Sequence, residues 1–211
     1  MFFNVKKIIF SVCIFFVSFQ IFSQAGKPDA LRLYNEGHFK EAIAVCEGEL
    51  EANPRNIESY VVLCWSLIKN KQYWECEQKA TAARKINSYD VRLIEVLGEA
   101  KFYLQKYDES MAMFQRYIAN AGENGSRVGE VYYFMGEIYI LQGKFQHADI
   151  SFSAAVRNSP QRAYWWSRLG YAKEKTSDWK NAVIAYDQAL KIDATQYDAV
   201  TGRKRCLPHL K

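Results

Sequence analysis

The sequence predicts an all-α protein built from helix-turn-helix hairpins, and residues 129–160 show the pattern most clearly. The first half of this stretch has one apolar helical face, made by Tyr132, Met135, Gly136 and Tyr139. Gly143 interrupts the pattern, and a second face follows at Phe145, Ala148, Phe152 and Ala155. Pro160 then ends the helix, so the stretch reads as an αα-hairpin. Glycine and proline are sparse, 11 and 4 of 211 residues, which argues against disorder.

The residues of this stretch resemble the tetratricopeptide repeat (TPR) consensus. With Gly129 as position 1, the matches fall at positions 4, 8, 11, 15, 17, 20, 24, 27 and 32, and Met135 replaces leucine at position 7. The resemblance implies an α-solenoid of stacked hairpins forming a right-handed superhelical arc. Neighbouring hairpins are expected to share one core, because a single hairpin cannot bury its own apolar face.

Residues 1–25 differ in composition from the rest of the chain. Lys6 and Lys7 precede an apolar run of 15 residues, Ile8–Phe22, and a small-x-small ending follows at Ala25. The run is shorter than the roughly 20 residues that a membrane helix needs. The pattern predicts a signal peptide cleaved after Ala25, hence export, to the periplasm or cell envelope if the source is bacterial. An uncleaved membrane anchor is the alternative.

The remainder divides into repeats of the same numbering. Residues 26–56 are expected to form a degenerate N-terminal repeat, because cleavage removes its start and Pro28 restricts what precedes it. Full repeats are expected at 57–90, 91–128, 129–162 and 163–196. Residues 197–211 are expected to form a C-terminal capping helix and tail whose polar face shields the end of the stack.

The third unit, 91–128, is four residues longer than the others. The extra residues lie in the polar, glycine-rich segment Gly122–Gly129, which predicts a surface loop. A hinge or a loop that contacts a partner is the alternative. In the capping helix, the basic run 203–205 is expected to be a solvated face, with a binding patch as the alternative.

Four cysteines would remain after cleavage: Cys46, Cys64, Cys76 and Cys206. In an oxidising compartment they allow three full pairings. Cys64 and Cys76 hold positions 8 and 20 of one repeat, where the resemblance brings the two helices closest, so a disulfide between them is predicted. Two reduced cysteines that serve as small packing residues are the alternative. No CxxC spacing occurs, so no metal site is expected.

The sequence carries no pattern typical of catalysis. His38, His147 and His209 are scattered, and no metalloprotease, nucleophile-elbow, P-loop or dinucleotide-binding motif occurs. We therefore predict no enzyme, no catalytic residues and no cofactor. Outside the leader, 26 basic and 23 acidic residues interleave along the chain, which argues against a nucleic-acid partner.

The TPR resemblance implies a concave groove lined by the first helix of each repeat, at positions 2, 5, 9, 12 and 13. Aromatic residues occupy several of these positions beyond the core: Trp65, Phe102, Tyr103, Tyr133 and Tyr171. Glu99 and Glu137 lie among them. Aromatic anchors on a concave face are typical of recognition sites, so we predict a groove for a segment with apolar anchors and some basic character. The alternative for each aromatic is packing between repeats.

Together these features predict an exported, non-enzymatic protein that binds a protein or peptide and acts as a scaffold or adaptor in an envelope assembly. A carbohydrate-binding module is one alternative, because aromatic rings with carboxylates also suit sugars. A membrane-anchored assembly factor with an uncleaved leader is another. Membrane association is expected only through the leader or a partner.

Overall fold

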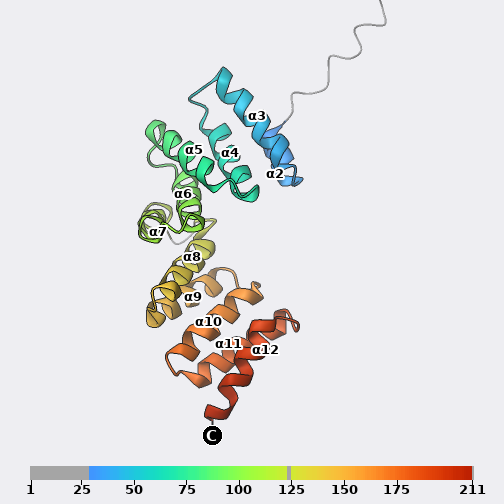
Figure 1. Ribbon diagram of the computed structural model, residues 1–211, viewed down its shortest axis with the longest axis vertical. Helices are drawn as coiled ribbons and strands as arrows, with labels where there is room; N and C mark the ends of the chain where they lie inside the picture. The colour runs from blue at the N-terminus through green and yellow to red at the C-terminus, as the bar shows by residue number, and fades with distance from the viewer. Residues whose placement is uncertain (1–28, 123–124, 211) are drawn as a thin grey trace, which may run out of the picture.

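The computed structural model describes residues 29–122 and 125–210, and over these residues the chain is a stack of helical hairpins (Figure 1). The hairpins are α2 (Ala30–Asn35) with α3 (Phe39–Ala52), α4 (Ile57–Lys69) with α5 (Tyr73–Ile86), α6 (Val91–Tyr103) with α7 (Tyr107–Ala121), α8 (Val128–Leu141) with α9 (Phe145–Asn158), and α10 (Ala163–Lys175) with α11 (Trp179–Ile192). The predicted all-α solenoid is confirmed. The predicted leader and its cleavage site lie outside the described residues.

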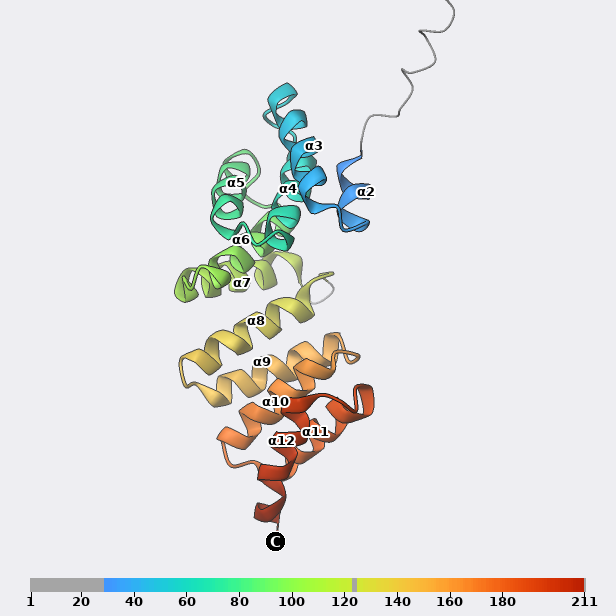
Figure 2. The ribbon, with the colours of Figure 1, turned by 45° about the vertical axis from the view of Figure 1, so that its right-hand side comes forward.

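The hairpins follow one another along the long axis of the molecule, from α2 at one end to α12 at the other (Figure 2). Successive first helices touch: α2 contacts α4, α4 contacts α6, and α6 contacts α8. These contacts make a wall of first helices, which is the surface where the sequence places its groove. Among the described residues, no helix has both the length and the apolar character needed to cross a membrane.

The turn inside each hairpin requires one residue in the left-handed backbone region. The five residues at this place have φ between 60° and 85°: Gly37, Lys71, Gln105, Gly143 and Ser177. Each is position 15 of its repeat, where the TPR consensus has glycine. Three of the five are L-residues, for which this conformation costs about 1–2 kcal/mol. The stacked helices therefore impose the turn even where the sequence does not favour it.

Inside three hairpins, a glycine lies directly under an aromatic ring. A Cβ at Gly98 would lie 2.7 Å from the ring of Phe114, at Gly136 2.6 Å from Phe152, and at Gly170 2.7 Å from Tyr186. These residues hold positions 8 and 24, so the ring fills the space that the missing side chain leaves. The buried ring in turn separates the two helices by a fixed amount.

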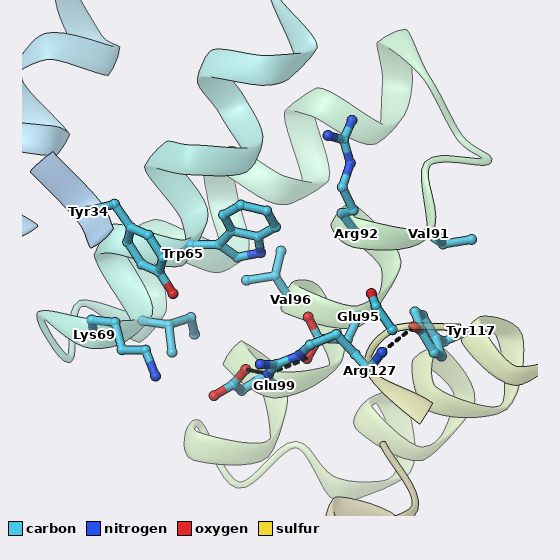
Figure 3. A pocket seen from close by; sticks show the side chains of 12 residues that line it. Tyr34, Trp65, Lys69, Val91, Arg92, Glu95, Val96, Glu99, Tyr117 and Arg127 are labelled. Carbon is cyan, nitrogen blue, oxygen red and sulfur yellow. Dashed lines mark hydrogen bonds and ion pairs between the residues drawn. The ribbon is translucent and has the colours of Figure 1, made fainter. Parts of the chain in front are cut away.

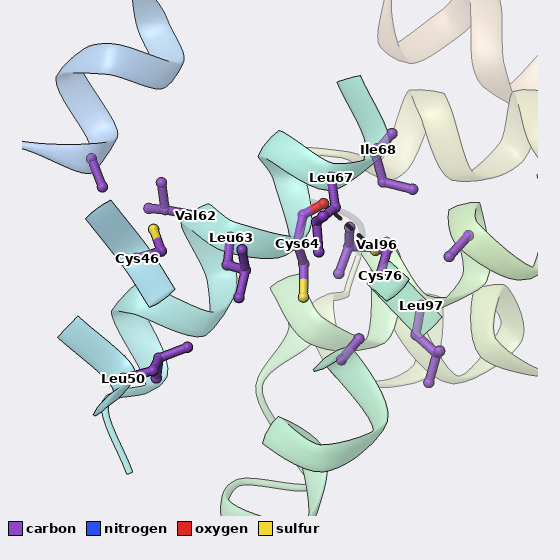
Figure 4. Packing of buried hydrophobic residues seen from close by; sticks show 13 residues of the cluster. Cys46, Leu50, Val62, Leu63, Cys64, Leu67, Ile68, Cys76, Val96 and Leu97 are labelled. Carbon is purple, nitrogen blue, oxygen red and sulfur yellow. Dashed lines mark hydrogen bonds between the residues drawn. The ribbon is translucent and has the colours of Figure 1, made fainter. Parts of the chain in front are cut away.

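The hairpin α4–α5 has different residues at positions 8 and 24. Cys64 takes the place of the glycine and Ala80 that of the ring, and both are fully buried (Figure 4). Cys46 and Cys76 lie in the same core cluster, with Leu63 and Leu67. Both side chains are small, and the surrounding residues of the cluster complete the packing.

The predicted disulfide between Cys64 and Cys76 is not formed in this structure, where the four cysteines of the described chain are free thiols. The Cys76 thiol donates to the backbone carbonyl oxygen of Cys64, with Sγ 3.5 Å from that oxygen. Hydrogen bonding with the Cys64 side chain, together with burial, raises the pKa of Cys76. The two thiols act here as small packing groups, and their pairing in the oxidised protein stays a prediction.

The described chain ends in α12 (Tyr197–Cys206) and the 3₁₀ turn η2 (Leu207–Leu210). Helix α12 packs on α10 and α11. Its basic run binds the preceding repeat: Arg203 Nε lies 2.6 Å from Asp187 Oδ1, and Arg205 Nε lies 2.7 Å from Glu174 Oε1. The side chains of Arg203 and Arg205 keep 39% and 51% of their surface exposed, so the run is solvated as expected while it also pairs with acids of α10 and α11.

Candidate functional site

The first helices α2, α4 and α6 and the residues just before α8 enclose a pocket of about 300 Å³ on the inner wall (Figure 3). Its principal side chains are Tyr34, Trp65, Lys69, Glu95, Glu99 and Arg127. The first two are aromatic and the last three form an ion-pair cluster. The pocket thus combines an apolar wall with charged groups, which is typical of a recognition site.

Glu95 and Glu99 share one face of α6 because they are four residues apart. Both are largely buried, with 2% and 8% of their surface exposed. Arg127, the residue before α8, reaches back and contacts both carboxylates. Its Nη2 lies 2.9 Å from Glu95 Oε1 and 3.3 Å from Glu99 Oε2, and its Nε lies 3.2 Å from Glu95 Oε1. One guanidinium therefore forms ion pairs with two carboxylates.

The surroundings of Glu95 and Glu99 raise the pKa of both carboxyl groups. Burial raises the pKa of Glu95 to about 7, with Glu99 adding to the rise and Arg127 opposing it. Burial also raises the pKa of Glu99, which Arg127, Lys69 and a hydrogen bond with the Glu95 side chain lower in part. Near neutral pH Glu95 is therefore partly protonated, because burial disfavours its charged form.

Trp65 on α4 and Tyr34 on α2 form the aromatic wall, with ring centroids 5.8 Å apart and ring planes inclined by 37°. In the view of Figure 3 they lie above the cluster formed by Glu95, Glu99 and Arg127. Trp65 and Glu99, which the sequence places in the groove, thus line one pocket. Both come from position 9 of adjacent repeats.

Phe102 and Tyr103, at the end of α6, lie apart from this pocket. Phe102 packs between repeats, with ring centroids 5.0 Å from Phe134 and 5.9 Å from Tyr107. Tyr103 stacks on Tyr73 at 4.4 Å and keeps 41% of its surface exposed. Phe102 is therefore mainly a packing residue, whereas Tyr103 presents part of its ring to solvent.

The remaining predicted groove residues, Tyr133, Glu137 and Tyr171, lie on α8 and α10, and Tyr171 also lines a second space of about 280 Å³ beside α12. Tyr133 stacks on Trp165 with centroids 5.2 Å apart and planes inclined by 10°. Arg168 binds both oxygens of Glu137, at 2.6 and 2.8 Å, and its guanidinium carbon lies 5.2 Å from the centre of the Tyr171 ring. The charge of Glu137 and one face of Tyr171 are thus already occupied.

Ion pairs between consecutive repeats run along the whole inner wall. In each, an acid on one first helix binds an arginine about one repeat further on: Glu58 with Arg92, Glu95 with Arg127, Glu137 with Arg168, and Glu174 with Arg205. The repeat consensus alone assigns no partners to these acids. A search for an acid followed by arginine 31 to 34 residues later would have found the pairs.

Two of the six principal pocket residues, Tyr34 and Arg127, are absent from the groove predicted by the sequence. Tyr34 holds groove position 12 of the degenerate first repeat, and the prediction covers only the full repeats. Arg127 lies in the predicted surface loop, and its backbone N–H donates to the hydroxyl of Tyr117, 3.0 Å away. In the sequence, the four-residue insertion before α8 is the feature that could have indicated a role for Arg127.

Comparisons with known proteins identify two matching families. The family model described as "Tetratricopeptide repeat" matches residues 129–162, and that described as "Anaphase-promoting complex, cyclosome, subunit 3" matches residues 35–117. Among curated proteins, anaphase-promoting complex subunit 3 of Schizosaccharomyces pombe is 27% identical over 147 residues. That alignment covers 68% of this chain but only 21% of the relative, so the chain spans about a fifth of the relative's length.

Solved structures with the same fold include three proteins of low sequence identity. MamA has a TM-score of 0.67 and 19% identity, covering 80% of this chain and 96% of MamA. YrrB, described as a TPR protein with an unusual peptide-binding site, has a TM-score of 0.65 and 18% identity, covering 83% and 88%. TTC0263, a TPR protein of Thermus thermophilus, has a TM-score of 0.62 and 17% identity, covering 85% and 95%. At these identities the likeness concerns the fold alone.

Proposed function

We propose that this chain, which belongs to the tetratricopeptide repeat family, is an exported, non-enzymatic scaffold that binds a segment of a partner protein in its groove. Its fold is that of a protein-interaction scaffold. The proposal places the bound segment along the inner wall of α2, α4 and α6.

The pocket beside Trp65 carries the proposal. There Trp65 and Tyr34, together with charged groups, border a space of about 300 Å³ on the inner wall. Aromatic anchors beside a cavity favour capture of a side chain from a bound segment. YrrB, a solved structure with the same fold, is described as having a peptide-binding site, and this supports peptide binding as a use of the fold.

Export to the periplasm or cell envelope is the second part of the proposal. Its support is the leader pattern of residues 1–25, with two lysines, an apolar run and a small-x-small ending. Mass analysis of the native protein tests it. The N-terminus is expected at Gly26, and a retained Met1 would favour the membrane-anchored alternative.

Selection from a phage-displayed library of random peptides tests the groove. Peptides selected on the wild-type protein are expected to lose binding to Trp65→Ala and Tyr34→Ala. The matched control is Trp74→Ala on α5, because Trp74 is 62% exposed and lies outside the pocket. Circular dichroism and melting confirm that each variant is folded.

Two outcomes would contradict the groove proposal. One is a peptide that binds both pocket variants as well as the wild type, which would place the contact elsewhere. The other is a library that yields no peptide while a glycan array yields a ligand, which would favour the carbohydrate-binding alternative. The tryptophan control separates a local effect from a general loss of aromatic surface.

A further inference from the structure

The Glu95–Glu99 pair differs from three other groove acids, because two buried carboxylates share the one arginine that contacts them. Glu58, Glu137 and Glu174 each bind an arginine through both carboxylate oxygens, at distances between 2.6 and 2.9 Å. Glu99 receives one contact, from Arg127, at 3.3 Å. A buried carboxylate with a single long contact is poorly compensated, so this position favours a second cation.

Among the described residues, no cation other than Arg127 makes an ion pair with Glu95 or Glu99. Lys69 on α4 lines the pocket and lowers the pKa of Glu99, yet it makes no ion pair among the described residues. Arg92 is held by Glu58 and Asp90, with contacts of 2.7 Å to each. The other groups that act on the pair are Tyr34, Tyr117 and Glu130, and none of these is a cation.

The aromatic wall provides the other half of a cation site. A guanidinium or ammonium group is attracted to the face of a tryptophan or tyrosine ring when it lies within about 6 Å of the ring centre. Trp65 and Tyr34 border the same pocket as the two carboxylates. A space of about 300 Å³ is large enough for a long side chain together with its hydration.

We propose that this pocket binds a lysine or arginine side chain of the segment held in the groove, and that binding releases a proton from the Glu95–Glu99 pair. The inference rests on the proposed function and specifies which residue of the segment is recognised. The bound cation lies against Trp65 and Glu99, opposite Arg127. Arg127 and the bound cation then offset the two ionised carboxylates, with Lys69 as a further positive charge in the pocket.

The release of a proton follows from the protonation state of the two carboxyl groups before the cation binds. Near neutral pH the pair holds a proton, because burial raises the pKa of Glu95 to about 7. A cation beside the pair favours its fully ionised form, so binding displaces that proton. The affinity for a cation therefore rises with pH, by about tenfold between pH 6 and pH 8 for one proton with a pKa of about 7.

A pair of small probes that differ only in charge tests the pocket without a known partner. The probes are N-acetyl-arginine N-methylamide and its neutral analogue N-acetyl-citrulline N-methylamide. Binding is measured from the indole N–H resonance of Trp65 in a nitrogen–proton correlation spectrum, identified by its loss in Trp65→Phe. The arginine probe is expected to bind at least about tenfold more tightly than the citrulline probe, and with the pH dependence above.

Three variants locate the effect. Glu99→Gln is expected to weaken the arginine probe about tenfold or more, and Glu95→Gln to remove its pH dependence. The matched control is Glu174→Gln, an acid of the same wall that binds Arg205 outside this pocket, and it is expected to change neither. Chemical shifts of residues far from each substitution show that the variants are folded.

Equal binding of the two probes, or unchanged binding in Glu99→Gln, would overturn the inference. Its failure is distinguishable from failure of the proposed function. Peptides that bind the groove through Trp65 regardless of their charge would leave the function standing and refute the basic-residue site. A charge-selective pocket in a protein that captures no peptide would leave the site standing and refute the function.

Discussion

The two halves of the inner wall use the same repeat positions for different purposes. Along α2, α4 and α6, Trp65 and Glu99 border an open pocket. Along α8 and α10, Tyr133 stacks on Trp165, and Arg168 occupies Glu137. Trp65, Glu99 and Glu137 all hold position 9, so the position alone does not decide whether a residue is available to a ligand. The residue that the next repeat places against it decides.

The same lesson applies inside the hairpins. In α8–α9 the ring of Phe152 lies over Gly136, whereas in α4–α5 Ala80 lies near Cys64. One hairpin places a ring over a glycine, and the other places two small side chains at the same positions. The residues that surround the smaller pair, among them Leu63 and Leu67, complete that core.

Replacing the residues of the α8–α9 contact by those of the α4–α5 contact is expected to have the largest effect on the free energy of unfolding. Phe152→Ala should lower the free energy of unfolding by about 3–5 kcal/mol, because it removes a fully buried ring above a glycine. Adding Gly136→Cys should recover part of that loss by rebuilding the α4–α5 arrangement in α8–α9. Denaturant unfolding of the two single variants and the double variant measures the coupling. Additive effects would show that the two positions do not share one space.

The pH dependence of stability should distinguish the Glu95–Glu99 pair from the satisfied acids of the wall. The folded pKa of Glu95, about 7, lies above its ordinary value of 4.5, so the folded state holds the extra proton between these values. Stability is therefore expected to fall as pH rises from about 4.5 to about 7, by up to about 3 kcal/mol. Glu95→Gln should remove this slope in unfolding measured at several pH values. The same slope in both proteins would place the proton elsewhere.

Truncating two groove aromatics should separate packing from exposure. Tyr133→Ala is expected to cost about 2–3 kcal/mol of stability, because its ring lies against Trp165 and Phe134. Tyr103→Ala should cost about 1 kcal/mol, since Tyr103 is 41% exposed and mainly stacks on Tyr73. Chemical denaturation ranks the two variants. A reversed order would mean that the wall along α8 is not filled as described.

The smallest expected effect concerns the hairpin turns. Lys71→Gly and Gln105→Gly should each raise stability by a few tenths to about 1 kcal/mol, because glycine relieves a positive φ while it adds entropy to the unfolded chain. Gly143→Ala is the matched reverse change and should destabilise by about 1 kcal/mol. Melting temperatures compare the three variants. Destabilisation by both glycine substitutions would show that the native turns carry no strain at these residues.

Local sequence determined which residues form helices and where the hairpins turn. Apolar residues at helical spacing and the pairing of Gly136 with Phe152 are properties of neighbouring segments, so the repeat consensus describes them directly. The aromatic character of the inner wall follows in the same way, and Trp65 and Glu99 lie together in the pocket where the sequence placed them.

Only the tertiary structure decided which charges on that wall stay available. Whether a groove acid is neutralised depends on the arginine that the next repeat places beside it. Arg127 reaches Glu95 and Glu99 because a four-residue insertion precedes α8, and two carboxylates then share one guanidinium. Contacts between residues some thirty positions apart depend on how the repeats stack, and for that reason a pattern read within one repeat does not contain them.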